Sequence, residues 1–190
     1  MRTRQNNIRG FTLVEMLVSI GIFAIIMSVS MGTLIVVIRA GSTAQTLQLL
    51  ASNASFAIDD MSRHIRTGYD YYCANSVSGS LPSGTADCED GGSVLVFTNA
   101  ETGKRMAYRL NSANNTIEQR IDTGNWFRIV STETKITALN FIVLNTDNLD
   151  TGDLLQPTVR ILIKGQSVDT TIEDSLFFIQ TTVVSRSLDV

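Results

Sequence analysis

The sequence predicts an α+β protein in which one long N-terminal helix packs on a C-terminal domain of antiparallel β-sheet. The helix is indicated by a run without Asp, Glu, Lys or Arg from Met16 to Ile38. The sheet is indicated by short β-rich segments that follow Gly68. Strands that come after a single helix, rather than alternating with helices, are typical of the α+β class. Residues 68–190 provide enough chain for one core, and we expect a single globular domain there.

The apolar run is long enough to cross a membrane. As a helix, its 23 residues reach about 35 Å, which exceeds the thickness of the hydrocarbon core. Arg2, Arg4 and Arg9 precede the run, and the first acidic residue of the chain is Glu15. The positive-inside rule therefore predicts a cytoplasmic N-terminus, with the rest of the chain outside. The alternative is a buried core helix, which a basic stretch ahead of a wholly apolar segment argues against.

The order of the N-terminal signals differs from that of a secretory signal peptide, whose cleavage site follows the apolar stretch. Here the basic stretch and Gly10 come before it, so cleavage after Gly10 leaves the apolar segment on the mature chain. The residues from Gly10 to Glu15, Gly-Phe-Thr-Leu-Val-Glu, resemble the processing signal of type IV pilins and type II secretion pseudopilins. The resemblance covers about 30 N-terminal residues. It implies that a prepilin peptidase removes residues 1–10 and that the new N-terminal residue, Phe11, is N-methylated.

Glu15 requires an explanation, because a carboxylate at the edge of the hydrocarbon costs a few kcal/mol unless it snorkels or finds a partner. Cleavage after Gly10 supplies a cation, the α-amino group of Phe11. The resemblance implies that this group faces the equivalent glutamate of a neighbouring subunit and so sets the register of assembly. The presence of Glu15 also argues against the kind of tip pseudopilin that lacks this residue. The alternative is that Glu15 simply lies in the headgroup layer.

Small residues recur every four positions in the apolar run, at Ala24, Ser28 and Gly32. This spacing places them on one face of a helix, where another backbone is able to approach closely. We expect residues 11–38 to form the membrane-embedded assembly half of the helix, with this face in contact with other helices.

Apolar residues continue at separations of three and four beyond Arg39, which predicts an amphipathic helical half over residues 39–67 that ends near Arg66. The stripe consists of Leu47, Leu50, Ala54, Ile58, Met61 and Ile65. We expect it to cover one face of the sheet. A long N-terminal helix, half in the membrane and half packed on a soluble domain, is also the architecture that the resemblance implies, and the predicted fold is pilin-like.

Seven strands are predicted in the rest of the chain, with hairpin turns at Asn114-Asn115 and at Thr123-Gly124-Asn125. The strands span Val94–Thr98, Arg105–Leu110, Thr116–Ile121, Trp126–Val130, Ile136–Asn145, Thr158–Lys164 and Leu176–Val184. We expect the last strand to pair inside the sheet. Together with Ile22-Phe23-Ala24 and the stretch from Asp60 to Arg66, this ending resembles the J-type minor pseudopilins.

The two cysteines, Cys73 and Cys88, lie 15 residues apart across a segment rich in Ser, Gly and Asp. Outside the cytoplasm such a pair is expected to form a disulfide, with free thiols as the alternative. A redox or zinc site needs closer ligands or a histidine, and the single histidine, His64, lies on the predicted helix.

An oxygen-rich loop with Asp147, Asp150 and Asp153 lacks the spacing of a calcium loop and its terminal glutamate, so a solvated turn is favoured over a calcium site. We expect no other metal and no cofactor. The sequence has no phosphate loop, nucleophile elbow or zinc-protease motif, and we do not expect an enzyme. Without the three leader arginines the charge becomes 12 minus 18, or −6, which gives no support for nucleic acid as a partner.

These observations predict a structural subunit, a minor pilin or pseudopilin, that assembles through its N-terminal helix. Its expected location is the bacterial inner membrane, as a single-pass protein with the N-terminus in the cytoplasm, and then the pilus or pseudopilus. The resemblance implies as partners the prepilin peptidase and methyltransferase, other pilin or pseudopilin subunits and an inner-membrane assembly platform, besides membrane lipid. The alternative is a singly anchored adhesin or DNA-uptake receptor whose β-domain binds a ligand. Cleavage and incorporation into fibres distinguish the first hypothesis from the second.

Overall fold

The computed structural model describes residues 10–146, 155–168 and 176–186. The chain divides into two compact units, Met1–Gln45 and Thr46–Val190. One helix, α1, runs from Leu13 to Arg66 and contributes to both units, while all the strands belong to the second. The predicted long helix is therefore confirmed, including its end at Arg66.

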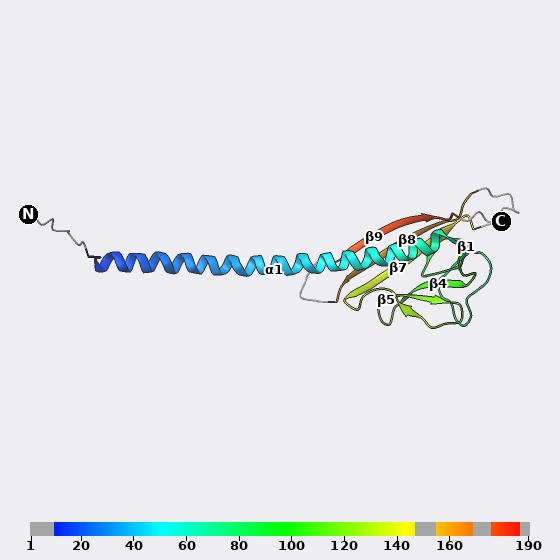
Figure 1. Ribbon diagram of the computed structural model, residues 1–190, viewed down its shortest axis with the longest axis horizontal. Coiled ribbons are helices and arrows are strands. Elements are labelled where there is room, and N and C mark those ends of the chain that lie inside the picture. Colours follow the sequence, from blue (N-terminus) through cyan, green and yellow to red (C-terminus); the bar gives the residue numbers. More distant parts are fainter. Residues whose placement is uncertain (1–9, 147–154, 169–175, 187–190) are drawn as a thin grey trace, which may run out of the picture. The chain divides into compact units, whose positions relative to one another are not determined.

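The strands form two antiparallel sheets in the part of the chain that the structure describes. The first sheet has the order β1-β3-β4-β5-β6, and the second has the order β2-β7-β8-β9. Figure 1 shows β7, β8 and β9 side by side in the second sheet. The strands are β1 (Gly68–Ala74), β2 (Cys88–Gly92), β3 (Val94–Asn99), β4 (Arg105–Asn111), β5 (Thr116–Ile121), β6 (Phe127–Arg128), β7 (Thr134–Leu144), β8 (Thr158–Ser167) and β9 (Phe177–Val184).

One hydrophobic core is shared by the inner faces of both sheets and by the second-unit part of α1. The helix buries a stripe at separations of three and four, consisting of Leu50, Ala54, Ala57, Met61 and Ile65. The sheets contribute alternate residues, such as Val159, Ile161 and Ile163 of β8, as expected for strands with one buried face. Leu47 of the predicted stripe is instead 42% exposed.

A smaller cluster covers the outer face of the first sheet. Val94, Val96 and Ala107 are buried there against side chains of the 75–87 loop and Trp126. Arg105 holds the loop in place, because its guanidinium donates from Nη2 to the carbonyl oxygen of Pro82 at 2.6 Å. Both faces of β3 are thus covered, which explains why all six of its residues are buried.

Several expectations about the strands were wrong. The predicted single sheet is two sheets, and β9 lies at the end of its sheet among the described strands rather than inside it. β1 was not predicted because a bulge interrupts its alternation, with Asp70 at a φ of 53°. β2, with the sequence Cys-Glu-Asp-Gly-Gly, has no β-forming residues to predict it. The strand expected at Trp126–Val130 is reduced to the two residues of β6.

Candidate functional site

The candidate processing site lies just ahead of the first residue of α1. Gly10 and Phe11 precede the helix, and the side chain of Phe11 is 76% exposed. The residue before the helix, Thr12, is its N-cap: the Thr12 Oγ1 accepts a hydrogen bond from the backbone N–H of Glu15 at 3.3 Å, and its carbonyl accepts one from Met16 at 3.2 Å. The peptide bond between Gly10 and Phe11 therefore lies outside the helix, where its backbone is open to a peptidase.

Thr12 is a residue that the sequence reasoning missed. Thr12 and Glu15 have the spacing of a capping box, in which Ser or Thr at the N-cap is followed three residues later by Glu or Gln. Glu15 also lies in the first turn, where the partial positive charge of the helix terminus favours an anion. The helix start thus provides a local reason for Glu15, beside the expected pairing with a neighbouring subunit.

The three small residues lie on one exposed face of α1, as their spacing predicts. The Ser28 hydroxyl donates to the Ala24 carbonyl at 2.8 Å, so it needs no partner from outside the helix. A Cβ added to Gly32 would meet no atom within 4 Å. Between Met16 and Ile38 the large apolar side chains are all at least half exposed. In the described part of the chain α1 is the one helix that is long and apolar enough to cross a membrane.

Comparison with known families agrees with this geometry. A model of the prokaryotic N-terminal methylation motif matches residues 5–31. The chain carries a prepilin-type methylation motif. This motif supports a membrane-anchored subunit of the pilin type. The motif ends within α1 and does not distinguish a pilin from a pseudopilin of the J type. No curated protein and no solved structure matches the chain.

The predicted disulfide is present and joins Cys73 of β1 to Cys88 of β2, with the Cα atoms 5.8 Å apart. It therefore links the edge strand of one sheet to the edge strand of the other. Backbone hydrogen bonds from Cys73 to Ala86 and from Ala86 to Tyr71 close the same loop. The bond anchors a segment that has few apolar side chains of its own.

Replacing both cysteines with alanine is expected to lower the free energy of unfolding by about 3 kcal/mol, because the 73–88 loop is then free in the unfolded chain. Urea denaturation with and without dithiothreitol measures the effect. The reductant should destabilise the parent protein and leave the Cys73→Ala/Cys88→Ala variant unchanged. Equal stability of parent and variant under oxidising conditions would contradict the proposed contribution of the bond.

The acidic loop that we considered for calcium, with Asp147, Asp150 and Asp153, lies outside the described residues. Asp87, beside Cys88, accepts backbone hydrogen bonds from Asn145 and Thr146 at 3.1 and 3.0 Å. Its carboxylate therefore caps the end of β7. Among the described residues no cluster of three His, Cys, Asp or Glu side chains has the arrangement of a metal site.

A polar network fastens α1 to the first sheet around the buried Tyr108. Its hydroxyl donates to the Asp60 carboxylate at 3.2 Å and accepts a hydrogen bond from Gln119 at 3.0 Å. His64 Nδ1 lies 2.9 Å from the same hydroxyl. Burial, reinforced by the Asp60 carboxylate, raises the pKa of Tyr108 well above its usual range. The neutral phenol is therefore part of the helix–sheet contact.

The raised pKa of Tyr108 predicts a loss of stability at alkaline pH. Above about pH 10 the unfolded chain releases the phenolic proton while the folded protein retains it, so the free energy of unfolding falls as pH rises. Tyr108→Phe should reduce this slope and should also weaken the folded state near pH 7, because the Asp60 carboxylate loses a donor. Denaturation curves from pH 8 to pH 11 test this, and identical slopes for the two proteins would contradict it.

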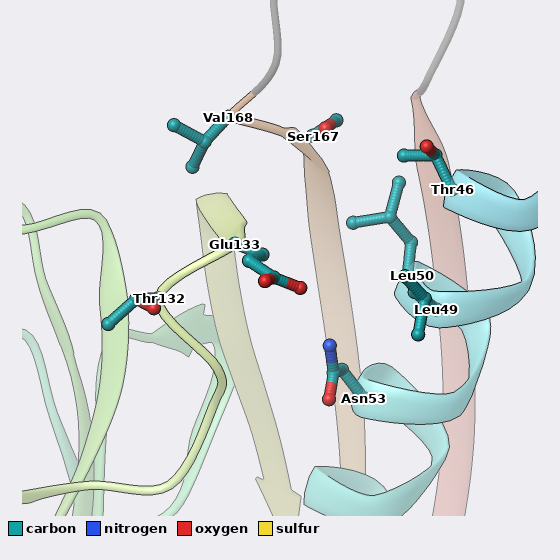
Figure 2. Close-up of a pocket in the computed structure, with 8 residues that line it drawn as sticks. All are labelled: Thr46, Leu49, Leu50, Asn53, Thr132, Glu133, Ser167 and Val168. Atoms are coloured by element: carbon teal, nitrogen blue, oxygen red, sulfur yellow. The ribbon is translucent and has the colours of Figure 1, made fainter. Parts of the chain in front are cut away.

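A cavity of about 430 Å³ lies in the second unit between α1 and the adjoining ends of β7 and β8 (Figure 2). Its described lining is Thr46, Leu49, Leu50, Asn53, Thr132, Glu133, Ser167 and Val168. Glu133 is the one titratable side chain of these eight.

Proposed function

We propose that the protein is a minor pilin or pseudopilin, a structural subunit that assembles through its N-terminal helix. The observation that supports this most is the methylation motif over residues 5–31, which extends into the exposed, uncharged helical segment from Met16 to Ile38. Large apolar side chains in this segment are stable only in lipid or against other apolar helices. The chain is thus an inner-membrane protein first and a filament component afterwards, and we assign it no enzymatic role.

Assembly has an energetic requirement that the proposed residues meet. A helix that leaves lipid for a bundle of similar helices gains little from the hydrophobic effect, so packing and polar contacts decide the outcome. The face with Ala24, Ser28 and Gly32 permits close approach, and Glu15 supplies a charge for the methylated amino group of Phe11. The prepilin peptidase creates that amino group by removing residues 1–10. The assembly platform and neighbouring subunits complete the set of proposed partners.

The test is the intact mass and N-terminal sequence of the protein extracted from membranes of cells with an active prepilin peptidase. A chain that begins with N-methylated Phe11 supports the proposal. A chain that still begins with Met1 contradicts it and favours an anchored receptor whose β-domain binds a ligand.

A matched pair of glycine variants makes this test specific. A Cβ at Gly10 or at Gly41 meets no atom within 4 Å, so valine fits the space at both positions. Gly10→Val is expected to abolish cleavage because it adds a branched side chain next to the scissile bond. Gly41→Val lies outside the motif and should be cleaved as the parent is.

A further inference from the structure

The edges of the two sheets differ in how well they are protected against pairing with another chain. Natural proteins protect edge strands by shortness, bulges, charges or covering segments. β6 has only two residues, and β2 is short, contains two glycines and carries Glu89 and Asp90. β1 has a bulge, and its edge is bridged by Ala86. Each of these three edges is protected by at least one recognised device.

The fourth edge, β9, is not protected by shortness, by a bulge or by a charge of its own. Its eight residues pair with β8 in an unbroken register and include neither a charged residue nor a proline. Ser185, directly after β9, donates its backbone N–H to the carbonyl of Pro157. This bond shows which residues of β9 direct their backbone groups toward β8, because hydrogen-bonded and non-hydrogen-bonded residues alternate along an antiparallel strand. Odd-numbered residues of β9 therefore bond to β8, and the even-numbered residues direct N–H and C=O groups away from it. These even-numbered residues are Phe178, Gln180, Thr182 and Val184.

The outward backbone groups of β9 have no hydrogen-bond partner among the described residues. The side chains of the same four residues lie on the exposed face of the sheet, where Phe178 is 63% exposed and Val184 is 47% exposed. An added strand would therefore gain backbone hydrogen bonds along the edge.

The charge of this face indicates what kind of strand it would accept. β7, β8 and β9 contain three basic residues and no acidic residue, although the whole chain is acidic. Arg160 and Lys164 are exposed on β8 directly beside Thr182 and Phe178, and within the described structure neither side chain has a hydrogen bond or ion pair. Lys135 of β7 is the third basic residue.

We propose that β9 is a docking edge for an extended segment of another protein that carries acidic residues at alternating positions. An added strand would lie about 10 Å from β8, two strand spacings away, which the long side chains of Arg160 and Lys164 are able to span across β9. The partner's acidic side chains would then face these two cations. A second copy is a poor occupant, because pairing β9 with itself brings two basic faces together.

Binding is tested on the full-length protein in detergent micelles. The probe is a short fluorescent peptide that alternates valine with glutamate, and its control alternates valine with lysine. The glutamate peptide is expected to bind about tenfold more tightly than the lysine peptide. Added salt should weaken the binding of the glutamate peptide. Amide hydrogen exchange should show new protection at Gln180 and Thr182 and no change at Thr181, which is already bonded to β8.

Two sets of variants locate the site. Thr182→Pro removes an outward N–H without removing a bond to β8. This variant is expected to bind the glutamate peptide about tenfold more weakly than the parent protein does. Thr182→Val keeps the N–H and is the matched control. Arg160→Glu with Lys164→Glu leaves the ladder intact and should reverse the preference between the two peptides, so the proposal remains testable if the proline variant does not fold.

Three results would overturn the proposal. The first is equal binding of both peptides to the parent and to the charge-reversed variant. The second is tighter binding of a single-stranded oligonucleotide than of the glutamate peptide, which would assign the basic face to nucleic acid. The third is concentration-dependent dimerisation that Thr182→Pro abolishes, which would assign the edge to a second copy.

Discussion

Glu15→Val is expected to leave cleavage after Gly10 intact and to reduce incorporation into filaments by at least about tenfold. The reason is that the carboxylate would no longer neutralise the methylated amino group of Phe11 in an environment without water. Leaving one member of a buried ion pair unpaired costs a few kcal/mol, and each 1.4 kcal/mol corresponds to about a factor of ten in an equilibrium. Incorporation is measured as the ratio of mature chain in sheared filaments to mature chain in membranes, with the two fractions separated and compared by immunodetection.

Glu15→Gln separates the two explanations for this residue. Glutamine serves as well as glutamate in a capping box with Thr12, but it has no charge to offer an amino group. If pairing between subunits is the role of Glu15, the glutamine variant should fail as the valine variant does. Normal incorporation of Glu15→Gln would contradict the pairing and leave helix capping as the role.

The N-terminal part of the chain could be read from its sequence because its signals are local. An uncharged run, a basic leader and apolar residues at separations of three and four each depend on neighbouring residues. The end of the helix near Arg66 followed from the same periodicity and from the β-rich segments beyond Gly68. The inclusion of Leu47 in the buried stripe was wrong, because burial depends on where the strands end and not on the helix alone.

The arrangement of the strands could not be obtained in this way. β2 has no β-forming residues, and its place in the sheet comes from pairing with β7 and from the bond between Cys88 and Cys73. β9 is rich in Phe, Val and Thr, which is typical of a strand inside a sheet, yet it lies at an end of the sheet order. Composition predicts that a segment forms a strand, and it does not predict which side of that strand is paired.

Some residues of the candidate processing site were predicted from the sequence and others were not. The motif directs attention to Gly10, Phe11 and Glu15, since the spacing of a processing signal is visible in one chain. The N-cap at Thr12 could also have been predicted, because Thr12 is followed three residues later by Glu15. It was not predicted because the same residues were assigned to the processing signal. The proposed partner of the Glu15 carboxylate is an amino group of another subunit, so the sequence and structure of a single chain do not test this pairing.

The largest effect on stability is expected for Phe97→Ala. Phe97 is fully buried on β3, and its ring centroid lies 6.0 Å from those of Tyr71 and Tyr108. It also packs so closely on Gly68 that an added Cβ there would lie 2.5 Å from its ring. Removing the ring leaves a cavity where β1, β3 and β4 meet the end of α1, and we expect the free energy of unfolding to fall by about 3–5 kcal/mol.

Phe56→Ala is the matched control, because it deletes the same ring from a position on α1 that is 68% exposed. Its effect on the free energy of unfolding should stay within about 0.5 kcal/mol. Urea denaturation of the full-length protein in micelles, followed by far-UV circular dichroism of the β-domain, compares the two variants. A whole domain is stable by only about 5–15 kcal/mol, so Phe97→Ala is expected to leave a large unfolded fraction at moderate urea concentration. Similar losses for the two variants would mean that the core does not determine the stability of the second unit.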